Sequence, residues 1–183
     1  MFSRRDSMHF IGAAAAAASL VGAKTARAQS APSTVKTLVN FEVPPGAVDT
    51  HVHFPDPQKF PFWSGRAYTP PVATADDLLA LQKALHMDHV VIVTPSVYGT
   101  DNSATLDGIK QLGLERARGV AVIDDKTSPA DLDAMHKAGV RGIRINLETG
   151  GVFDPAVAAK KLDAAVQQIA AAPGTSRSMR DCR

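Results

Sequence analysis

HVVIVTP, at residues 89–95, decides the fold of this chain. Five consecutive β-branched residues make a run without polar–apolar alternation, which is typical of a strand buried on both faces. Helical patterns lie on either side of it. Residues 74–85 begin at Thr74 with acidic residues in the first turn and leucines at helical spacing, and residues 101–112 begin at a second polar cap. A buried strand between two helices predicts an α/β protein with a parallel sheet.

The same alternation of strand and helix continues in both directions. Strand patterns recur at residues 47–54, 119–123 and 140–146, and helical patterns at residues 128–139 and 155–172. Four strand–helix units in a row predict parallel strands joined by right-handed crossovers. A doubly wound sheet and a (β/α)8 barrel both fit, but no glycine-rich phosphate fingerprint follows the first strand, which counts against a dinucleotide-binding fold. A complete barrel needs about 250 residues, so we predict the N-terminal half of a TIM-type (β/α)8 barrel.

Residues 1–28 have the pattern of a twin-arginine signal peptide. Arg4 and Arg5 precede an apolar run at residues 10–23, and residues 26–28 (ARA) supply a small-x-small cleavage site. The run is too short for a permanent membrane span. We therefore expect export to the periplasm or beyond, with an amphipathic helix or a simple membrane anchor as the alternative.

The other segments follow from the repeat pattern. Residues 29–46 form a polar linker and lead-in, residues 47–172 form the four-unit half barrel, and residues 173–183 have neither strand nor helix pattern. This last segment stands where a fifth strand is expected. The pattern favours truncation by a frameshift or premature stop over a naturally short tail.

Charge and cysteine content exclude some functions. The whole chain has a formal net charge of +2, but four basic residues and one acidic residue lie in residues 1–28. The 16 basic and 17 acidic side chains beyond them give a net charge of −1, which offers no basic footprint for nucleic acid. Cys182 is the only cysteine, so no internal disulfide can form.

Two histidines stand at the end of the first predicted strand. His51 and His53 alternate with Val52 and therefore share one face of the strand with Asp49. The carboxyl ends of barrel strands face the active-site mouth. Two imidazoles there can ligate a metal, hold a substrate carbonyl or transfer protons. A structural role is the alternative for the pair.

The remaining histidines and the aromatic residues near the first loop carry weaker expectations. A structural or solvated role is expected for the histidines at helix positions and at a strand start: His86, His89 and His136. Two alternative roles remain for four aromatic side chains, which either form the wall of the pocket mouth or pack the loop: Phe54, Phe60, Phe62 and Trp63.

Several stretches together resemble one known family. VDTHVHF, at residues 48–54, is similar to the opening strand of the amidohydrolase superfamily. Later stretches resemble its branch of 2-pyrone-4,6-dicarboxylate hydrolase and related lactone-processing enzymes: FPF (60–62), RAYTPP (66–71), PSVYGTDN (95–102), RGVA (118–121) and GVRGIRIN (139–146). The resemblance extends over residues 41–172 and implies a hydrolase that acts on a lactone or related carboxylic ester.

The resemblance also implies roles for particular residues. His51 and His53 would polarise the substrate carbonyl without a tightly held metal, or would bind a weakly held divalent ion such as zinc. Ser96 and Tyr98 would donate to substrate oxygen atoms, with loop packing as the alternative for Tyr98. Arg144 would pair with a substrate carboxylate, for which a planar guanidinium is suited, with a structural ion pair as its alternative.

Two departures from the family pattern limit what the resemblance implies. Residues 145–150, after Arg144, contain no second arginine, which favours a lactone or ester with fewer charges than a dicarboxylate. Arg141 is expected on the outer or lower side of its strand. The later-strand histidine and the final-strand aspartate, the expected base, have no counterparts. The alternative is a catalytically incomplete half barrel that binds ligand, or forms a homodimer through its exposed edges, and we expect little turnover from the chain alone.

Overall fold

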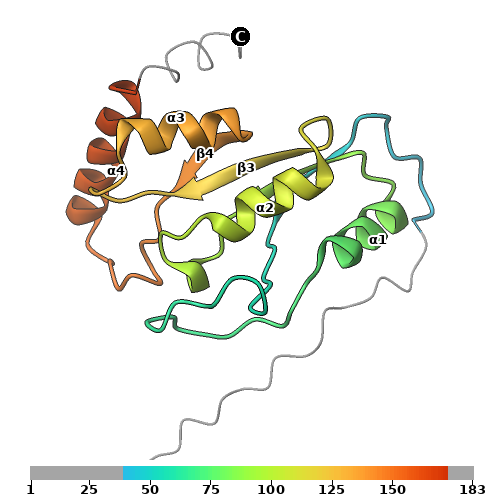
Figure 1. Cartoon of the computed structure of the whole chain (residues 1–183), viewed down its shortest axis with the longest axis horizontal. Helices are drawn as coiled ribbons and strands as arrows, with labels where there is room; N and C mark the ends of the chain where they lie inside the picture. The colour runs from blue at the N-terminus through green and yellow to red at the C-terminus, as the bar shows by residue number, and fades with distance from the viewer. Residues whose placement is uncertain (1–38, 173–183) are drawn as a thin grey trace, which may run out of the picture.

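The computed structural model describes residues 39–172, which fold as four successive strand–helix units (Figure 1). The elements are β1 (Val48–Val52), α1 (Ala75–Leu85), β2 (His89–Val93), the 3-10 helix η1 (Ser96–Tyr98), α2 (Ser103–Leu112), β3 (Ala117–Val122), α3 (Pro129–Lys137), β4 (Val140–Arg144) and α4 (Pro155–Ala170). Their order confirms the predicted α/β repeat. The expected signal segment (1–28), the first part of the linker and the irregular tail (173–183) lie outside the described residues.

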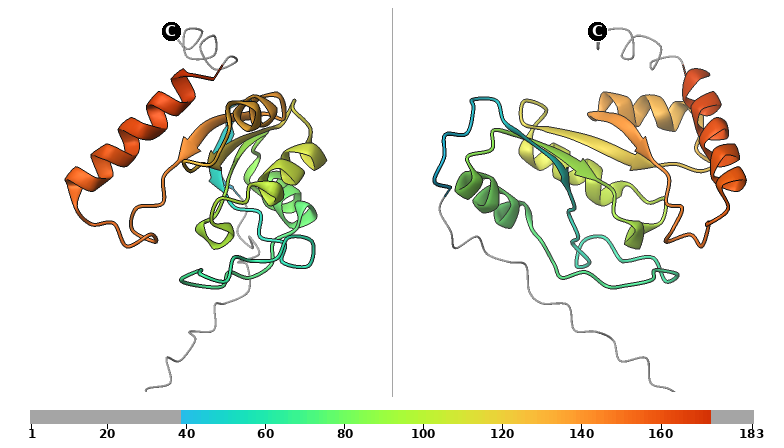
Figure 2. Two further views of the ribbon diagram at one scale, coloured as in Figure 1. Left: turned by 60° about the vertical axis from the view of Figure 1, so that its left-hand side comes forward. Right: turned by 180° about the vertical axis from the view of Figure 1, so that it is seen from behind.

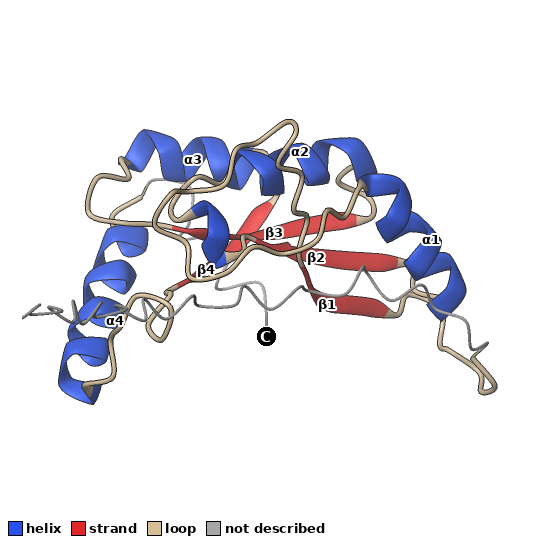
Figure 3. Cartoon of the chain, turned by 90° about the horizontal axis from the view of Figure 1, so that it is seen from below, coloured by secondary structure: helices blue, strands red, loops and turns tan. Residues whose placement is uncertain are grey.

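All four strands are parallel and lie in chain order, β1-β2-β3-β4. Helices α1, α2 and α3 cover one face of this sheet, and α4 stands beside the end of β4 (Figure 3). Parallel strands in chain order with helices on one outer face are the arrangement of a barrel, whereas a doubly wound sheet carries helices on both faces. The sheet therefore matches the predicted half of a (β/α)8 barrel.

Two helices begin where the sequence predicts because a polar side chain caps each of them. Thr74 accepts a hydrogen bond from the backbone N–H of Asp77, whose carboxylate accepts one from the backbone N–H of Thr74. Ser128 and Asp131 repeat this capping box at α3, where Pro129 follows at the first position. Each box satisfies N–H groups that the first helical turn leaves unpaired, and the fixed φ of proline suits that turn.

The hydrophobic core lies between the sheet and helices α1 to α3. Its largest buried members are Phe54, Leu78, Val90, Ile92, Ile109, Leu132, Met135 and Val140. On β3, Gly119 leaves no room for a side chain, because an added Cβ would lie 2.6 Å from Cδ1 of Ile109. The glycine therefore allows α2 to approach the sheet closely.

Phe54 belongs to this core, so neither of the two roles expected for it, pocket wall or loop packing, is correct. Its side chain is 2% exposed, and a Cβ added at Gly108 of α2 would lie 3.4 Å from its ring. The reason is the alternation of side chains: Phe54 points away from the face of His53, toward the face that α2 covers.

Helix α4 projects from the body of the sheet (Figure 2). It also turns apolar side chains to solvent. Leu162 and Val166 are 53% and 54% exposed. Strands β1 and β4 each pair with a single neighbour within residues 39–172, and unpaired strand edges favour association.

Within residues 39–172, no helix combines the length and the apolar character that crossing a bilayer requires.

Candidate active site

His53 follows directly after β1 and is oriented by one hydrogen bond. Its Nδ1 lies 2.8 Å from the carbonyl oxygen of Val93, the last residue of β2. A carbonyl oxygen only accepts, so Nδ1 carries the proton and the neutral ring keeps a lone pair on Nε2. The hydrogen bond therefore presents Nε2 as an acceptor, a base or a metal ligand.

The surroundings of His53 keep its ring uncharged at neutral pH. Burial lowers the pKa of this imidazole below its usual 6.5, because desolvation disfavours the charged form. The hydrogen bond to Val93 acts in the opposite direction, whereas the positive charges of Arg144 and His51 lower the pKa further. A ring that is neutral at pH 7 can take a proton at Nε2.

His51 lies beside His53, as the alternation along the strand predicts. The two rings meet edge to face, with centroids 5.1 Å apart. His51 is exposed, and its backbone N–H donates to the Asp49 carboxylate at 3.3 Å. The register of β1 with β2 shifts between Asp49 and Val52. The irregularity therefore includes the position of His51, and bulges beside active sites re-aim side chains.

The histidine pair does not make up a catalytic zinc site. Catalytic zinc takes three protein ligands, and residues 39–172 contain no group of three His, Cys, Asp or Glu side chains that could hold a metal ion. His51 and His53 are the imidazoles that would face such an ion. They supply two of the three protein ligands that catalytic zinc takes, so a weakly held divalent ion such as zinc stays a prediction.

Arg144, the last residue of β4, reaches the same place as His53. Its Nη1 lies 3.5 Å from the carbonyl oxygen of Thr94, just beyond the end of β2, and its charge lowers the pKa of His53. Strand β3 lies between β2 and β4, so the side chain reaches past the end of β3. Among the described residues no carboxylate forms an ion pair with Arg144, which leaves the guanidinium free for an anionic ligand.

Ser96 lies in the wall of a cavity of about 250 Å³ at the carboxyl ends of β2, β3 and β4. The side chains that matter for its chemistry are Trp63, Arg66, Ser96, Asp124, Asn146 and Lys161. Ser96 is the one predicted site residue that lines it, and His51, His53, Tyr98 and Arg144 do not. Asn146 comes two residues after Arg144, so the chain after β4 links the candidate active site to the wall of the cavity.

Tyr98 is buried below the loop rather than facing this cavity. Its hydroxyl oxygen accepts a hydrogen bond from the backbone N–H of Asp56 at 2.9 Å, and its ring lies 5.2 Å from that of Phe62. Burial raises the pKa of Tyr98 to about 12, so the phenol stays protonated. These contacts match the packing alternative for Tyr98.

The loop aromatics divide between the two roles expected for them. Phe60 and Phe62 pack against a small buried cluster that contains Val97 and Tyr98. Trp63 is 53% exposed and lines the cavity. Loop packing is therefore right for the two phenylalanines, and a place in the pocket wall is right for Trp63.

Asn102 holds the ends of two strands together, a role that sequence reasoning missed. Its Oδ1 accepts from the backbone N–H of Val122 and from the hydroxyl of Thr94, and its Nδ2 donates to the Val122 carbonyl oxygen. The sequence suggested a helix cap, but no side-chain cap bond forms at Asn102. Nothing in the local pattern indicates this link, because its partners lie on different strands.

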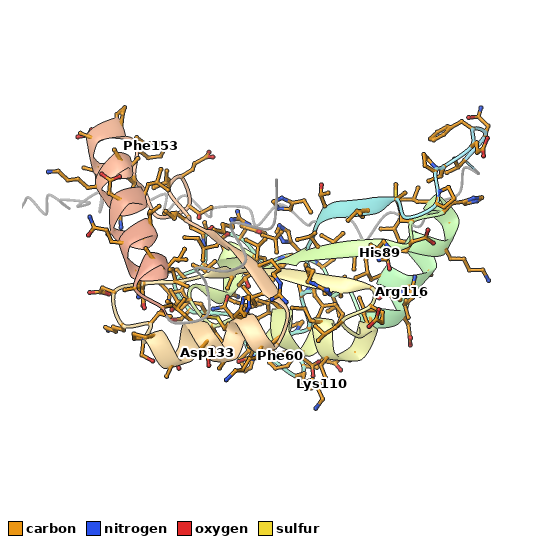
Figure 4. The ribbon with its side chains drawn as sticks, turned by 90° about the horizontal axis from the view of Figure 1, so that it is seen from above. Phe60, His89, Lys110, Arg116, Asp133 and Phe153 are labelled. Atoms are coloured by element: carbon orange, nitrogen blue, oxygen red, sulfur yellow. The ribbon has the colours of Figure 1, made fainter. Side chains whose placement is uncertain are left out.

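Within residues 39–172, the histidines other than His51 and His53 have structural roles. His89 opens β2 at the opposite end of the molecule from Phe153 (Figure 4), and its Nδ1 bonds the carbonyl oxygen of Glu115. His86 is the left-handed C-cap of α1, with φ 58°. Arg141 donates to the backbone carbonyl of His136, which confirms that this arginine lies outside the candidate site.

Comparison with known proteins identifies the family. The model of an amidohydrolase family (Amidohydro_2) matches residues 48–170. The chain is 43% identical over 107 residues to a 2-pyrone-4,6-dicarboxylate hydrolase of Comamonas testosteroni, and 37% identical over 119 residues to a 4-sulfomuconolactone hydrolase of Rhizobium radiobacter. These alignments cover 58% and 64% of this chain but 35% and 38% of the relatives. The chain thus spans less than half the length of these curated relatives.

A solved structure has the same arrangement of strands and helices. The crystal structure of a probable 2-pyrone-4,6-dicarboxylic acid hydrolase of Acinetobacter baumannii, with citric acid bound, is 28% identical and gives a TM-score of 0.58. The match covers 67% of this chain and 45% of that chain, as expected for part of a barrel. Because the family model extends over nearly all of the described residues, this chain belongs to the amidohydrolase family.

Proposed function

We propose that this chain carries the proton-accepting and carboxylate-binding groups of a hydrolase that opens a lactone or related carboxylic ester. One observation carries the proposal: His53 and Arg144 meet at the carboxyl end of β2, through Val93 and Thr94. Nε2 of His53 and the guanidinium of Arg144 are both available to a ligand there. The names of the Comamonas and Rhizobium relatives, which refer to hydrolysis of a pyrone and of a muconolactone, support this substrate class.

Arg144 is suited to orient the substrate. A guanidinium binds a carboxylate through two parallel hydrogen bonds, which fixes direction as well as distance. A carboxylate held at Arg144 places the rest of the molecule over the end of β2, toward His53. The reacting carbonyl would then lie between the arginine and the two imidazoles.

His51 and His53 take different parts in this scheme. Neutral His53 has no proton on Nε2, so it accepts the proton of a water molecule that attacks the lactone carbonyl carbon. The exposed ring of His51 donates to the carbonyl oxygen as negative charge develops there. The ring C–O bond then breaks, the leaving oxygen takes the proton from His53, and a hydroxy acid is released. Polarisation of the carbonyl by both histidines, as the resemblance implies, is the alternative to this division.

A second candidate function is ligand binding without turnover. It needs only the guanidinium of Arg144, which forms no ion pair within residues 39–172 and can bind a carboxylate whether or not hydrolysis follows. In this case Arg144 still binds a carboxylate, but no hydroxy acid forms. Release of product separates the two candidates.

Arg144→Gln tests the carboxylate site, with Arg141→Gln as the matched control on the same strand. Binding is measured for a carboxylated γ-lactone and for its methyl ester, and product release is followed in parallel. We expect Arg144→Gln to weaken binding of the carboxylated lactone by about 10- to 100-fold and to leave the ester unaffected. Arg141→Gln should leave both affinities unchanged. Equal losses in the two variants would contradict the proposal, and binding without product would support the second candidate.

A further inference from the structure

The side-chain amide of Asn102 uses every donor and acceptor that it has. Its Oδ1 accepts from the backbone N–H of Val122 and from the hydroxyl of Thr94, both at 2.8 Å. Its Nδ2 donates to the carbonyl oxygens of Val122 and Thr100, at 2.8 and 3.1 Å. An amide offers two acceptor positions and two donor hydrogens, so the fold satisfies this side chain completely. Any effect of Asn102 on ligand binding must therefore pass through its partners.

A second hydroxyl group holds Thr94 from another side. The hydroxyl oxygens of Thr94 and Thr105 lie 2.7 Å apart, and both side chains are buried. The single proton of the Thr94 hydroxyl goes to Asn102, because an amide oxygen cannot donate. Thr105 must then donate to Thr94. The start of α2 thus holds Thr94 through two side chains, that of Asn102 at the N-cap and that of Thr105 in the first turn.

The partners Thr94 and Val122 are also the neighbours of Arg144. The carbonyl oxygen of Thr94 accepts from Nη1 of Arg144 at 3.5 Å, and Val122 is the register partner of Arg144 between β3 and β4. Thr94 is itself joined to β3, because its N–H donates to the carbonyl oxygen of Val120 at 2.9 Å. The backbone and the guanidinium of Arg144 therefore both lie against groups that Asn102 holds together.

The orientation of Arg144 depends on the position of the Thr94 carbonyl. A separation of 3.5 Å is long for an N–H···O bond, so a small displacement of this carbonyl oxygen would break the contact. No ion pair within residues 39–172 holds the guanidinium in its place instead. An arginine that is not oriented in advance loses more side-chain entropy when it binds a carboxylate.

We propose that Asn102 is a positioning residue, which keeps the guanidinium of Arg144 oriented for an anionic ligand by fixing Thr94 and Val122. The proposal rests on the proposed function, because it explains how the carboxylate-binding arginine is held. Loss of the Asn102 amide should leave the charge of Arg144 intact and let its position vary.

The ring of His53 reports the position of Arg144 in the absence of any ligand. Burial lowers the pKa of His53 most, and the positive charge of Arg144 lowers it further. This pKa is measured by NMR titration of the full chain, with His53→Asn to assign the signal. Arg144→Gln removes the charge and should raise the pKa, and Asn102→Ala should raise it by part of that amount. When Arg144→Gln is already present, Asn102→Ala should cause no further rise, since two changes that act through one group are not additive.

Two substitutions at Thr94 repeat the test without altering Asn102, should Asn102→Ala fail to fold. Thr94→Val removes the hydroxyl that bonds Asn102, whereas Thr94→Ser keeps it. The valine variant should therefore raise the pKa of His53, and the serine variant should not. Ser128→Ala is the stability control, because it removes the side-chain cap of α3 and weakens the fold without changing a partner of Arg144. It should leave the pKa of His53 unchanged.

Binding of a carboxylated γ-lactone and of its methyl ester supplies the functional readout. Asn102→Ala should weaken binding of the acid by about 3- to 10-fold and leave the ester unaffected, whereas a general loosening of the fold would weaken both. Equal losses for acid and ester, additive pKa shifts in the double variant, or an equal pKa shift in Ser128→Ala would overturn the proposal. If Arg144→Gln does not distinguish acid from ester, the proposed function fails, while the NMR titration still shows whether Asn102 positions Arg144.

Discussion

His53 donates from Nδ1 to the carbonyl oxygen of Val93, 2.8 Å away, and this bond joins the chain just after β1 to the end of β2. The same bond fixes the tautomer of the ring, because a carbonyl oxygen cannot donate. Burial and the charge of Arg144 lower the pKa of His53, despite the bond to Val93. The side chain of His53 therefore serves both the fold and the chemistry. Its Nδ1 links the chain after β1 to the end of β2, and its Nε2 is available to a ligand.

The buried hydroxyl of Tyr98 should contribute to stability and not to ligand binding. Tyr98→Phe removes the acceptor of the Asp56 N–H and keeps the ring packing on Phe62, so we expect a loss of about 1 kcal/mol in the free energy of unfolding. Urea unfolding measures this loss, and binding of a carboxylated lactone should stay unchanged. Unchanged stability together with weaker binding would instead favour the substrate-contact role.

Tyr98 should also make stability depend on pH in the alkaline range. Burial raises its pKa to about 12, above the ordinary value of 10.0, so the folded state favours the neutral phenol. This contribution is fully present below about pH 10 and is lost as the pH rises toward about 12. Urea midpoints over this range should fall more steeply for the wild type than for Tyr98→Phe. Parallel curves would show that Tyr98 is not the group responsible.

Gly119 should be intolerant of a methyl group, because its Cβ would lie 2.6 Å from Cδ1 of Ile109. Gly119→Ala is expected to destabilise the fold by about 1–3 kcal/mol through overpacking. Gly142→Ala on the neighbouring strand is the control, since its Cβ would make an ordinary contact of 3.4 Å with Val120. Denaturant unfolding of both variants measures the difference, and equal stabilities would contradict the packing of α2 on β3.

The exposed apolar face of α4 should promote self-association. Leu162 and Val166 are about half exposed, beside a strand edge that is unpaired in the described residues. We expect the full chain to form dimers in sedimentation experiments, and Leu162→Glu with Val166→Glu to shift it to monomer. Gln167→Glu adds a charge on the same helix and should leave the dimer intact. A monomeric wild type would count against the predicted homodimer.

The order of elements could be predicted because its signals are local. The first five residues of HVVIVTP form β2, and the capping boxes at Thr74 and Ser128 start α1 and α3 where the capping residues stand. The pairing of His51 with His53 followed from strand alternation alone. Export by a twin-arginine signal stays a prediction, because residues 1–28 lie outside the described part of the chain.

Other features depend on contacts that no local pattern contains. Phe54 follows the histidines in sequence but packs under α2, and Asn102 bonds Val122 instead of capping its helix. Lys161 reaches the cavity because Gln168 binds the loop after β3, a contact over 44 residues. Lys161 thus comes to line the cavity of Ser96 only in the folded chain.

His53→Asn tests the central claim most directly. The asparagine Nδ2 can replace Nδ1 as donor to Val93, but no atom replaces Nε2, so the fold should persist without the base. His86→Asn is the control, because asparagine tolerates the left-handed conformation that His86 adopts. Hydrolysis of a carboxylated γ-lactone is measured for the full chain and both variants. Although we expect little turnover from the chain alone, that rate should fall at least about 100-fold in His53→Asn and stay unchanged in His86→Asn. Equal rates of hydrolysis for the wild type and His53→Asn would contradict the account.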